Sequence, residues 1–174
     1  DEALLRIDPG QLEQLLHPRM DPVAEVEVLC TGLGASPGAA TGKIVLTAQE
    51  AAERGGAGEA VSLVRKETDP DDVEGMMRAK GVLTALGGMT SHAAVVARGM
   101  GKPAVTGCSA LKIDANADAF RVKDRVFEAG DVITIDGTSG RVIAGEGPLV
   151  EPEIDEDFET ILRWADRVRA LGVR

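Results

Sequence analysis

Residues 82–99 constrain the fold more strongly than any other part of the sequence. They begin with a short apolar run that is typical of a buried strand, turn at Gly87 and Gly88, and continue as a run of small apolar residues. Paired glycines let the backbone turn sharply and leave room for another group to approach. Hydroxyl side chains accept hydrogen bonds from the unpaired N–H groups at a helix start, so Thr90 and Ser91 predict that a helix begins there. A strand, a tight turn and a helix in succession are typical of an α/β domain.

The same alternation of short strands and helices runs through most of the chain. A hairpin-like β pattern replaces it towards the C-terminal side, where Asp136-Gly137 indicates a turn. Thr68 or Asp69 can cap the second helix, and we expect Gly81 to end it. The expected strands are 42–47, 61–65, 82–85, 103–107 and several within 121–143, and the expected helices are 49–54, about 70–80 and 91–98.

The composition restricts how the core is filled. The chain contains 21 glycines, but only three phenylalanines, one tryptophan and no tyrosine. Val, Ala, Leu and Ile must therefore fill the core, with tight turns between short elements. This composition describes an α/β domain with many strands.

The two ends of the chain differ from its middle. Residues 1–29 are interpreted as a linker arm with a short helix at 11–16, which Pro18 stops. Residues 30–150 form the expected compact domain. Residues 151–174 are interpreted as a charged amphipathic linker helix, with apolar residues on one side: Phe158, Ile161, Leu162, Ala165 and Val168.

Charge and cysteine content exclude several classes of function. The net charge of −10 argues against nucleic acid or an anionic membrane as a partner, since both require basic surfaces. No apolar run is long enough to span a membrane, and no leader peptide is recognisable. Cys30 and Cys108 lack a CxxC partner, so we expect thiols in a reducing cytoplasm, either or both in the core. The acidic cluster at residues 69–74 lacks the spacing of a calcium-binding loop, and no metal site is expected.

His92 is the candidate catalytic residue. It falls in the first turn of the predicted helix, where unpaired N–H groups and the helix dipole stabilise a phosphoryl dianion. A neutral imidazole is a competent nucleophile near neutral pH, and it leaves readily once phosphorylated. An isolated histidine at a helix start is often only a surface residue, and that reading stays open on residue types alone. For Arg98, further along the same helix, we expect a salt bridge or a domain contact.

The exact string GGMTSHAAVVARGMGKP resembles the phosphohistidine signature of the enzymes that interconvert pyruvate and phosphoenolpyruvate (PEP). The likeness is strongest to the pyruvate, phosphate dikinase family and its PEP-utilising mobile domain. It extends to LLRIDPGQLEQLLHP, GASPGAATGKIV and LVRKETDPDDVEGM, and so covers nearly the whole chain. Related PEP synthases usually have cysteine at the position of Ser91, and they commonly have arginine at that of Met89, so both residues favour the dikinase.

The resemblance implies a swivelling phosphohistidine domain of the β/β/α type, in which layers of strands lie beside helices, within a larger phosphotransferase. An ATP-grasp nucleotide-binding region would precede it and a pyruvate-binding TIM barrel would follow it, both in the same chain, in a cytoplasmic and homodimeric enzyme. The family converts ATP, phosphate and pyruvate into AMP, pyrophosphate and PEP. His92 matches its carrier histidine, and Gly87, Gly88, Thr90 and Ser91 match the supporting turn and helix start. Mg²⁺ is expected in the partner domains, with no cofactor in this domain, which alone would be catalytically incomplete.

Some positions leave alternatives open. Thr90 matches a site of regulatory phosphorylation in plant members, although a cap or turn role explains a threonine there equally well. Leu86 departs from the family, in which many members have arginine before the paired glycines. The alternative functions are the phosphocarrier domain of a PEP synthase-like enzyme and a non-catalytic module that retains the fold.

Overall fold

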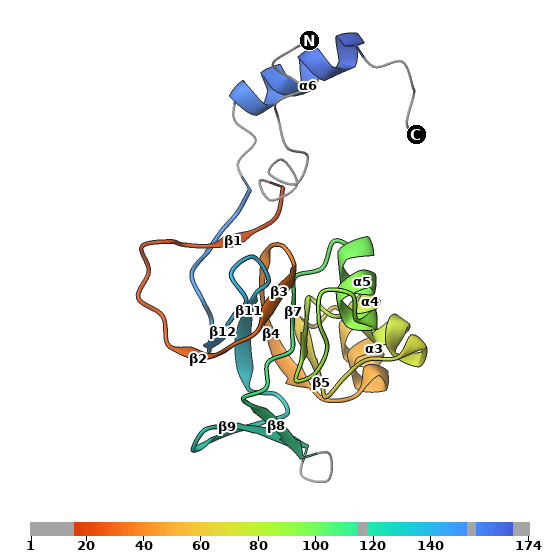
Figure 1. The fold of residues 1–174 in the computed structure, drawn as a ribbon, viewed down its shortest axis with the longest axis vertical. Helices are drawn as coiled ribbons and strands as arrows, with labels where there is room; N and C mark the ends of the chain where they lie inside the picture. The colour runs from red at the N-terminus through yellow and green to blue at the C-terminus, as the bar shows by residue number, and fades with distance from the viewer. Residues whose placement is uncertain (1–15, 115–117, 153–155, 169–174) are drawn as a thin grey trace.

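The chain forms a layered α/β structure. The computed structural model describes residues 16–114, 118–152 and 156–168. An eight-stranded sheet has three helices on one face, and a smaller three-stranded sheet covers part of the other face (Figure 1). Each face has its own hydrophobic core, so the expected mixed α/β class is confirmed.

The large sheet combines parallel and antiparallel strands. Its central strands β4 to β7 are parallel, as expected for strands that alternate with helices. The remaining neighbours pair antiparallel. The order across the sheet is β2 (Val28–Thr31), β12 (Arg141–Ala144), β11 (Val132–Asp136), β4 (Ala39–Val45), β5 (Val61–Arg65), β6 (Gly81–Thr84), β7 (Ala104–Thr106) and β3 (Leu33–Ser36).

The sheet curls until its two edges approach each other. The edge strands β2 and β3 are separated in sequence by Gly32 alone, whose N–H donates to the carbonyl of Gly140 at 2.8 Å. A Cβ atom built on Gly34 would lie 2.5 Å from the carbonyl oxygen of Gly137, so a side chain does not fit at this position. Glycine therefore permits the close backbone contact that closes the sheet.

The helix layer follows the sequence prediction closely. It comprises α3 (Ala48–Gly56), α4 (Val73–Arg78) and α5 (His92–Gly99), with a short 3₁₀ turn η1 (Pro70–Asp72) before α4. The prediction that Gly81 ends the second helix is wrong. That helix ends at Arg78, and Gly81 is the first residue of β6, where the chain already pairs with β5.

The small sheet covers the core on the face opposite the helices. It consists of β8 (Leu111–Asp114), β9 (Ala119–Val122) and β10 (Arg125–Glu128), all antiparallel. Phe120 and Phe127 stack with ring centroids 5.3 Å apart and belong to the same hydrophobic core as the large sheet. The predicted β pattern within residues 121–143 is confirmed by the strands from β9 to β12.

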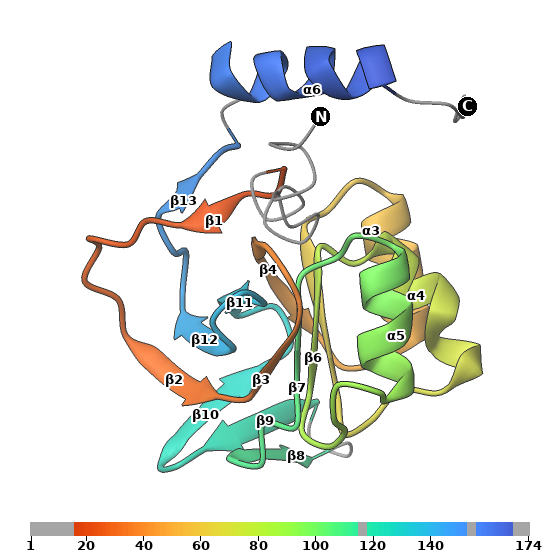
Figure 2. The same ribbon diagram turned by 45° about the horizontal axis from the view of Figure 1, so that its top comes forward.

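The N-terminal arm pairs with the last strand of the 30–150 segment. Strand β1 (Arg19–Met20) pairs antiparallel with β13 (Leu149–Val150), and the buried Met20 packs with Ala39 and Ile143. The tail helix α6 (Glu156–Val168) lies beyond this pair, away from the helix layer (Figure 2). Most of the helix expected at residues 11–16 lies outside the described residues. Within the described ranges, no helix has the length and apolar character needed to cross a bilayer.

Candidate functional site

Two segments of the site meet at one edge of the large sheet. Strands β5 and β6 are parallel and end at Arg65 and Thr84. The chain after β5 carries Thr68, and the chain after β6 carries the glycine turn and His92. In open α/β sheets, ligands bind outside the carboxyl ends of the strands. The predicted site residues therefore lie where the fold class places binding sites.

Glycine is required in the turn for steric reasons. Gly87 has φ = +106°, and a Cβ atom at this position would lie 2.9 Å from the side chain of Ser91. Gly107, in the loop after β7, approaches the carbonyl of Gly87 so closely that a Cβ would lie 2.6 Å from that oxygen. A Cβ on Gly88 meets no atom within 4 Å, so the outer side of the turn is open.

Ser91 is the residue that caps α5. Its hydroxyl accepts from the N–H of Ala94 at 3.4 Å and donates to the carbonyl of Gly88 at 2.7 Å. Thr90, the other predicted cap, is exposed and makes no such bond in α5. The first N–H groups of a helix have no intrahelical acceptor, and in α5 the structure gives one of them, that of Ala94, the Ser91 hydroxyl as its partner.

His92 is held through one ring nitrogen. Its Nδ1 lies 3.1 Å from the hydroxyl oxygen of Thr68, and its side chain is half-buried. Thr68 is 9% exposed. Sequence reasoning gave Thr68 only as a helix cap, and the structure assigns that cap to Asp69, whose side chain accepts from the N–H of Asp71. With Asp69 in the capping role, the hydroxyl next to it is free to engage the histidine.

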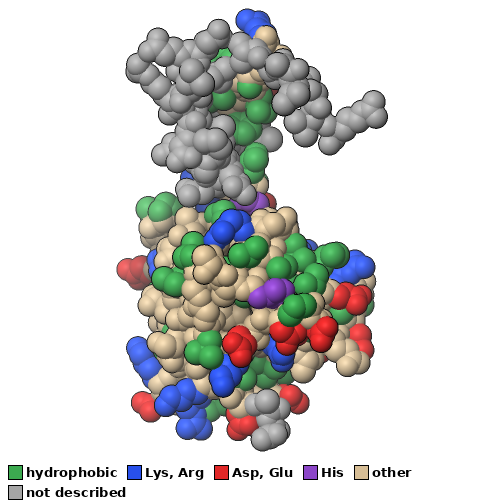
Figure 3. Space-filling view, turned by 45° about the vertical axis from the view of Figure 1, so that its right-hand side comes forward, with side chains coloured by type: hydrophobic (Ala, Val, Ile, Leu, Met, Phe, Trp, Pro, Cys, Tyr) green, Lys and Arg blue, Asp and Glu red, His purple; other side chains and the backbone are tan. Residues whose placement is uncertain are grey.

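Apolar side chains stand exposed around the glycine turn and α5. Leu86, Met89 and Val95 are 46%, 45% and 54% exposed. Figure 3 shows hydrophobic side chains beside a histidine on this face of the body. Apolar side chains grouped at a surface indicate a contact with another molecule or domain.

Arg98 connects the helix to the sheet rather than to a carboxylate. Its guanidinium donates to the carbonyl of Ala35 at 2.9 and 3.2 Å, and to that of Met89 at 3.4 Å. Of the two expected contacts, the salt bridge is not found for Arg98 among the ion pairs of the described residues, and backbone carbonyls of β3 and of the glycine loop take its place. Lys102 similarly donates to the carbonyl of Ala79 at 2.8 Å, and burial lowers the pKa of its ammonium.

The two cysteines are core thiols. Cys30 and Cys108 are both buried and unbridged, with sulfur atoms 2.7 Å apart. The contact with the Cys108 thiol and burial both raise the pKa of Cys30, which therefore stays protonated at neutral pH. They belong to the hydrophobic core, as one of the sequence alternatives proposed.

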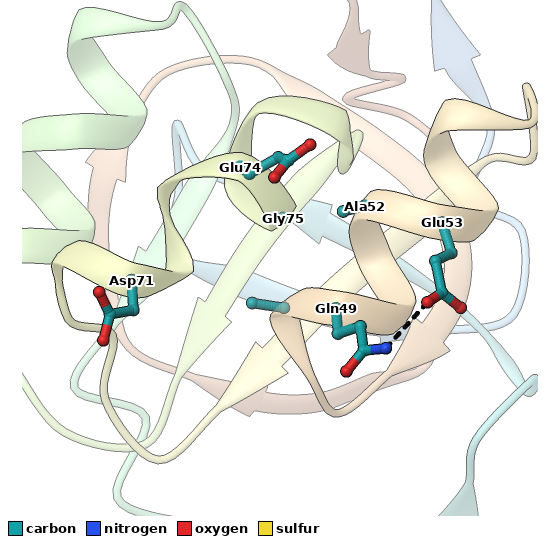
Figure 4. A pocket seen from close by; sticks show the side chains of 7 residues that line it. Gln49, Ala52, Glu53, Asp71, Glu74 and Gly75 are labelled. Atoms are coloured by element: carbon teal, nitrogen blue, oxygen red, sulfur yellow. Dashed lines mark hydrogen bonds between the residues drawn. The ribbon is translucent and has the colours of Figure 1, made fainter.

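A cavity elsewhere on the surface is acidic and differs in character from the His92 edge. It lies between α3 and the η1–α4 segment and is lined by Glu53, Asp71 and Glu74 (Figure 4). Gln49 donates to Glu53 at 2.9 Å along α3, on one side of the cavity. Carboxylates repel a phosphoryl dianion, so this cavity is unsuited to phosphate. In the part of the chain that the structure describes, no group of His, Cys, Asp or Glu is arranged to hold a metal ion.

Comparisons with known proteins show a similarity along the whole chain. Residues 58–140 match the model of the PEP-utilising enzyme mobile domain. Along 174 residues, all of this chain, the sequence is 51% identical to the pyruvate, phosphate dikinase of Rhizobium meliloti. It is 48% identical to that of Clostridium symbiosum, again over the whole chain, and 48% identical to chloroplastic pyruvate, phosphate dikinase 1 of Arabidopsis thaliana over 98% of the chain.

The match covers only part of those relatives. The chain spans 18–20% of their length. A solution NMR structure of Enzyme I matches 63% of this chain and 37% of its own, at 26% identity, but its TM-score of 0.37 is too low to compare the folds. The resemblance to the pyruvate, phosphate dikinase family is confirmed by these sequence matches, and residues 58–140 are similar to the PEP-utilising enzyme mobile domain.

Proposed function

We propose that the chain is the phosphocarrier domain of a pyruvate, phosphate dikinase, and that His92 holds the phosphoryl group. The observation that carries this proposal is the placement of His92 in the first turn of a capped helix, beside an open glycine turn. Identity near one half along the whole chain with pyruvate, phosphate dikinases supports the reaction class.

The bond to Thr68 supports Nε2 as the nucleophile. A proton on Nδ1 can be donated to the hydroxyl oxygen of Thr68, which leaves the lone pair of the neutral imidazole on Nε2. Nε2 would then attack the phosphorus of the donor, forming an N–P bond while the bond to the leaving oxygen breaks. The N–H groups at the start of α5, which lack intrahelical acceptors, would stabilise the bound dianion. Transfer to the next acceptor reverses these steps.

The proposal requires that His92 visit sites on other domains. The ATP-grasp and TIM-barrel regions, with Mg²⁺, would supply the nucleotide and pyruvate chemistry from the same, longer chain. The exposed apolar side chains of Leu86, Met89 and Val95 suit a surface that docks and releases. The arms, 1–29 and 151–174, would tether the 30–150 domain as it swivels. The β1–β13 pair lies close to where both arms would join this domain.

Transfer of phosphoryl to the chain in trans tests the carrier role. Labelled PEP and a full-length relative whose own carrier histidine is replaced by alanine would be mixed with this chain. We expect an acid-labile, base-stable phosphate that maps to His92 by mass spectrometry, and none in a His92→Ala variant.

A matched positive control makes a negative result informative. The corresponding segment of the same relative, with its histidine intact, would be treated in parallel. Label on that segment and none on this chain would contradict the carrier role. Label on both would also show that the pyruvate side recognises this domain.

A further inference from the structure

A second concave site lies at the carboxyl edge of the sheet, next to the glycine turn. A cavity of about 320 Å³ is lined by Lys66, which follows β5, and by Leu86, which follows β6. Ser109, in the loop after β7, and Lys112, in β8, complete its polar lining. Parallel strands direct the segments after their carboxyl ends to one edge, so residues far apart in sequence converge here.

The charges in this cavity are positive, although the chain as a whole is acidic. The chain carries a net charge of −10, yet both ionisable residues that line the cavity are lysines. Among the described residues, no carboxylate lies within ion-pair distance of Lys66 or Lys112. Lys112 also lies directly opposite Arg121 in the β8–β9 ladder. Like charges in opposite positions of a sheet are destabilising, and a bound anion would relieve that repulsion.

The other residues that line the cavity also favour the binding of an anion. Ala85, Leu86, Leu111 and Ile113 provide an apolar lining, and Ser109 adds a hydroxyl that can donate a hydrogen bond. Apolar walls lower the effective dielectric constant, so a charge pair is stronger here than in open water. An apolar cavity with a few converging polar groups is the usual form of a small-molecule site.

We propose that this cavity binds a phosphate-type oxyanion between the ammonium groups of Lys66 and Lys112. The residues that line this cavity do not include His92. Leu86, which does line it, precedes the glycine turn of Gly87 and Gly88, and His92 follows that turn. The acidic cavity between α3 and α4 lacks this chemistry, since its ionisable lining residues are carboxylates. The proposal does not depend on the carrier role of His92.

Titration with inorganic phosphate, followed by ¹H–¹⁵N NMR of the whole chain, tests the proposal. Ionic strength would be held constant with sodium chloride, so that general screening stays fixed. We expect saturable shifts at the amides of Lys66, Ser109 and Lys112, with a dissociation constant of the order of 1 mM, which corresponds to about −4 kcal/mol. The double variant Lys66→Gln/Lys112→Gln should weaken this binding at least about tenfold, which is about 1.4 kcal/mol.

Two further variants locate the effect. Lys80→Gln removes the same charge from an exposed lysine at the opposite, amino-terminal end of β6, and should leave the titration unchanged. His92→Ala should also leave it unchanged. Shifts that do not saturate, that persist in the double lysine variant, or that are confined to the start of α5 would overturn the proposal.

Discussion

At the scale of single residues, the site depends on a pairing that sequence alone does not reveal. The glycine turn, the cap and His92 lie within six consecutive residues, and their types predict their roles. Thr68 is 24 residues from His92, and only the parallel pairing of β5 with β6 brings their segments together. The local pattern therefore indicates His92 as the candidate nucleophile, but it gives no sign of the hydrogen bond between His92 and Thr68.

Thr68→Val keeps the shape of the side chain and removes its hydroxyl. We expect the protonated population of His92 Nδ1 to fall, because its hydrogen-bond acceptor is lost. Phosphoryl transfer should slow about five- to tenfold, for the net loss of about 1 kcal/mol that a hydrogen bond contributes. ¹⁵N NMR of the imidazole measures the tautomer directly. Thr68→Ser should restore both values, and an unchanged tautomer in Thr68→Val would contradict the orienting role.

The ion pairs of Glu59 with Arg54 and Lys43 predict how the stability of the native state depends on pH. Glu59 accepts from Arg54 at 2.6 Å and from Lys43 at 2.7 Å, and these two bonds lower its pKa from 4.5 to about 2. The carboxylate therefore stabilises the native state above pH 4.5, and this contribution is lost as the pH falls towards 2. Glu59→Gln should lower the urea midpoint slightly at neutral pH. It should also reduce the loss of stability on acidification, and an unaltered acid profile would refute the assignment.

At the scale of elements, the turns and helix boundaries were predictable where local chemistry determines them. The Ser91 cap and the strand at 61–65 follow directly from the sequence. Gly81 was misassigned because glycine is equally typical of a helix end and of a strand start. Helix packing was not predictable, since it depends on which small residues face each other after folding.

Gly75 illustrates this dependence on packing. A Cβ built on it would lie 2.4 Å from the carbonyl oxygen of Ala48, where α4 crosses α3. Gly→Ala in a helix usually stabilises by up to about 1 kcal/mol, but here we expect Gly75→Ala to destabilise by about 1–3 kcal/mol. Gly99→Ala, in α5, meets no atom within 4 Å and should be neutral or mildly stabilising. Urea denaturation compares the two, and equal effects would show that the α3–α4 contact is looser than described.

At the scale of the whole molecule, the sheet order could not be derived from the sequence. The pairing of β1 with β13 joins residues 19–20 to 149–150, and β2 pairs with β12 across a comparable separation. Such contacts carry no local signal. The layered α/β class and most strand positions were nevertheless predictable, because the periodicity of apolar residues reports them.

The exposed apolar side chains around α5 predict a docking phenotype. Met89→Ser should slow phosphoryl transfer in trans about five- to tenfold, because apolar contact at the interface is lost. Its thermal stability should hardly change, since the side chain is 45% exposed. Val126→Ser removes an apolar side chain of similar exposure, 51%, from β10 and should not affect transfer. Equal slowing by both variants would argue against a docking surface at Met89.

The most direct test of the central claim is to identify the phosphorylated atom. After labelling in trans, long-range ¹H–¹⁵N and ³¹P NMR of the chain would locate the phosphorus on the imidazole of His92. We predict an N–P bond at Nε2, with Nδ1 still protonated and facing Thr68. Phosphorus on Nδ1, on Thr90 or on Ser91 would contradict the account.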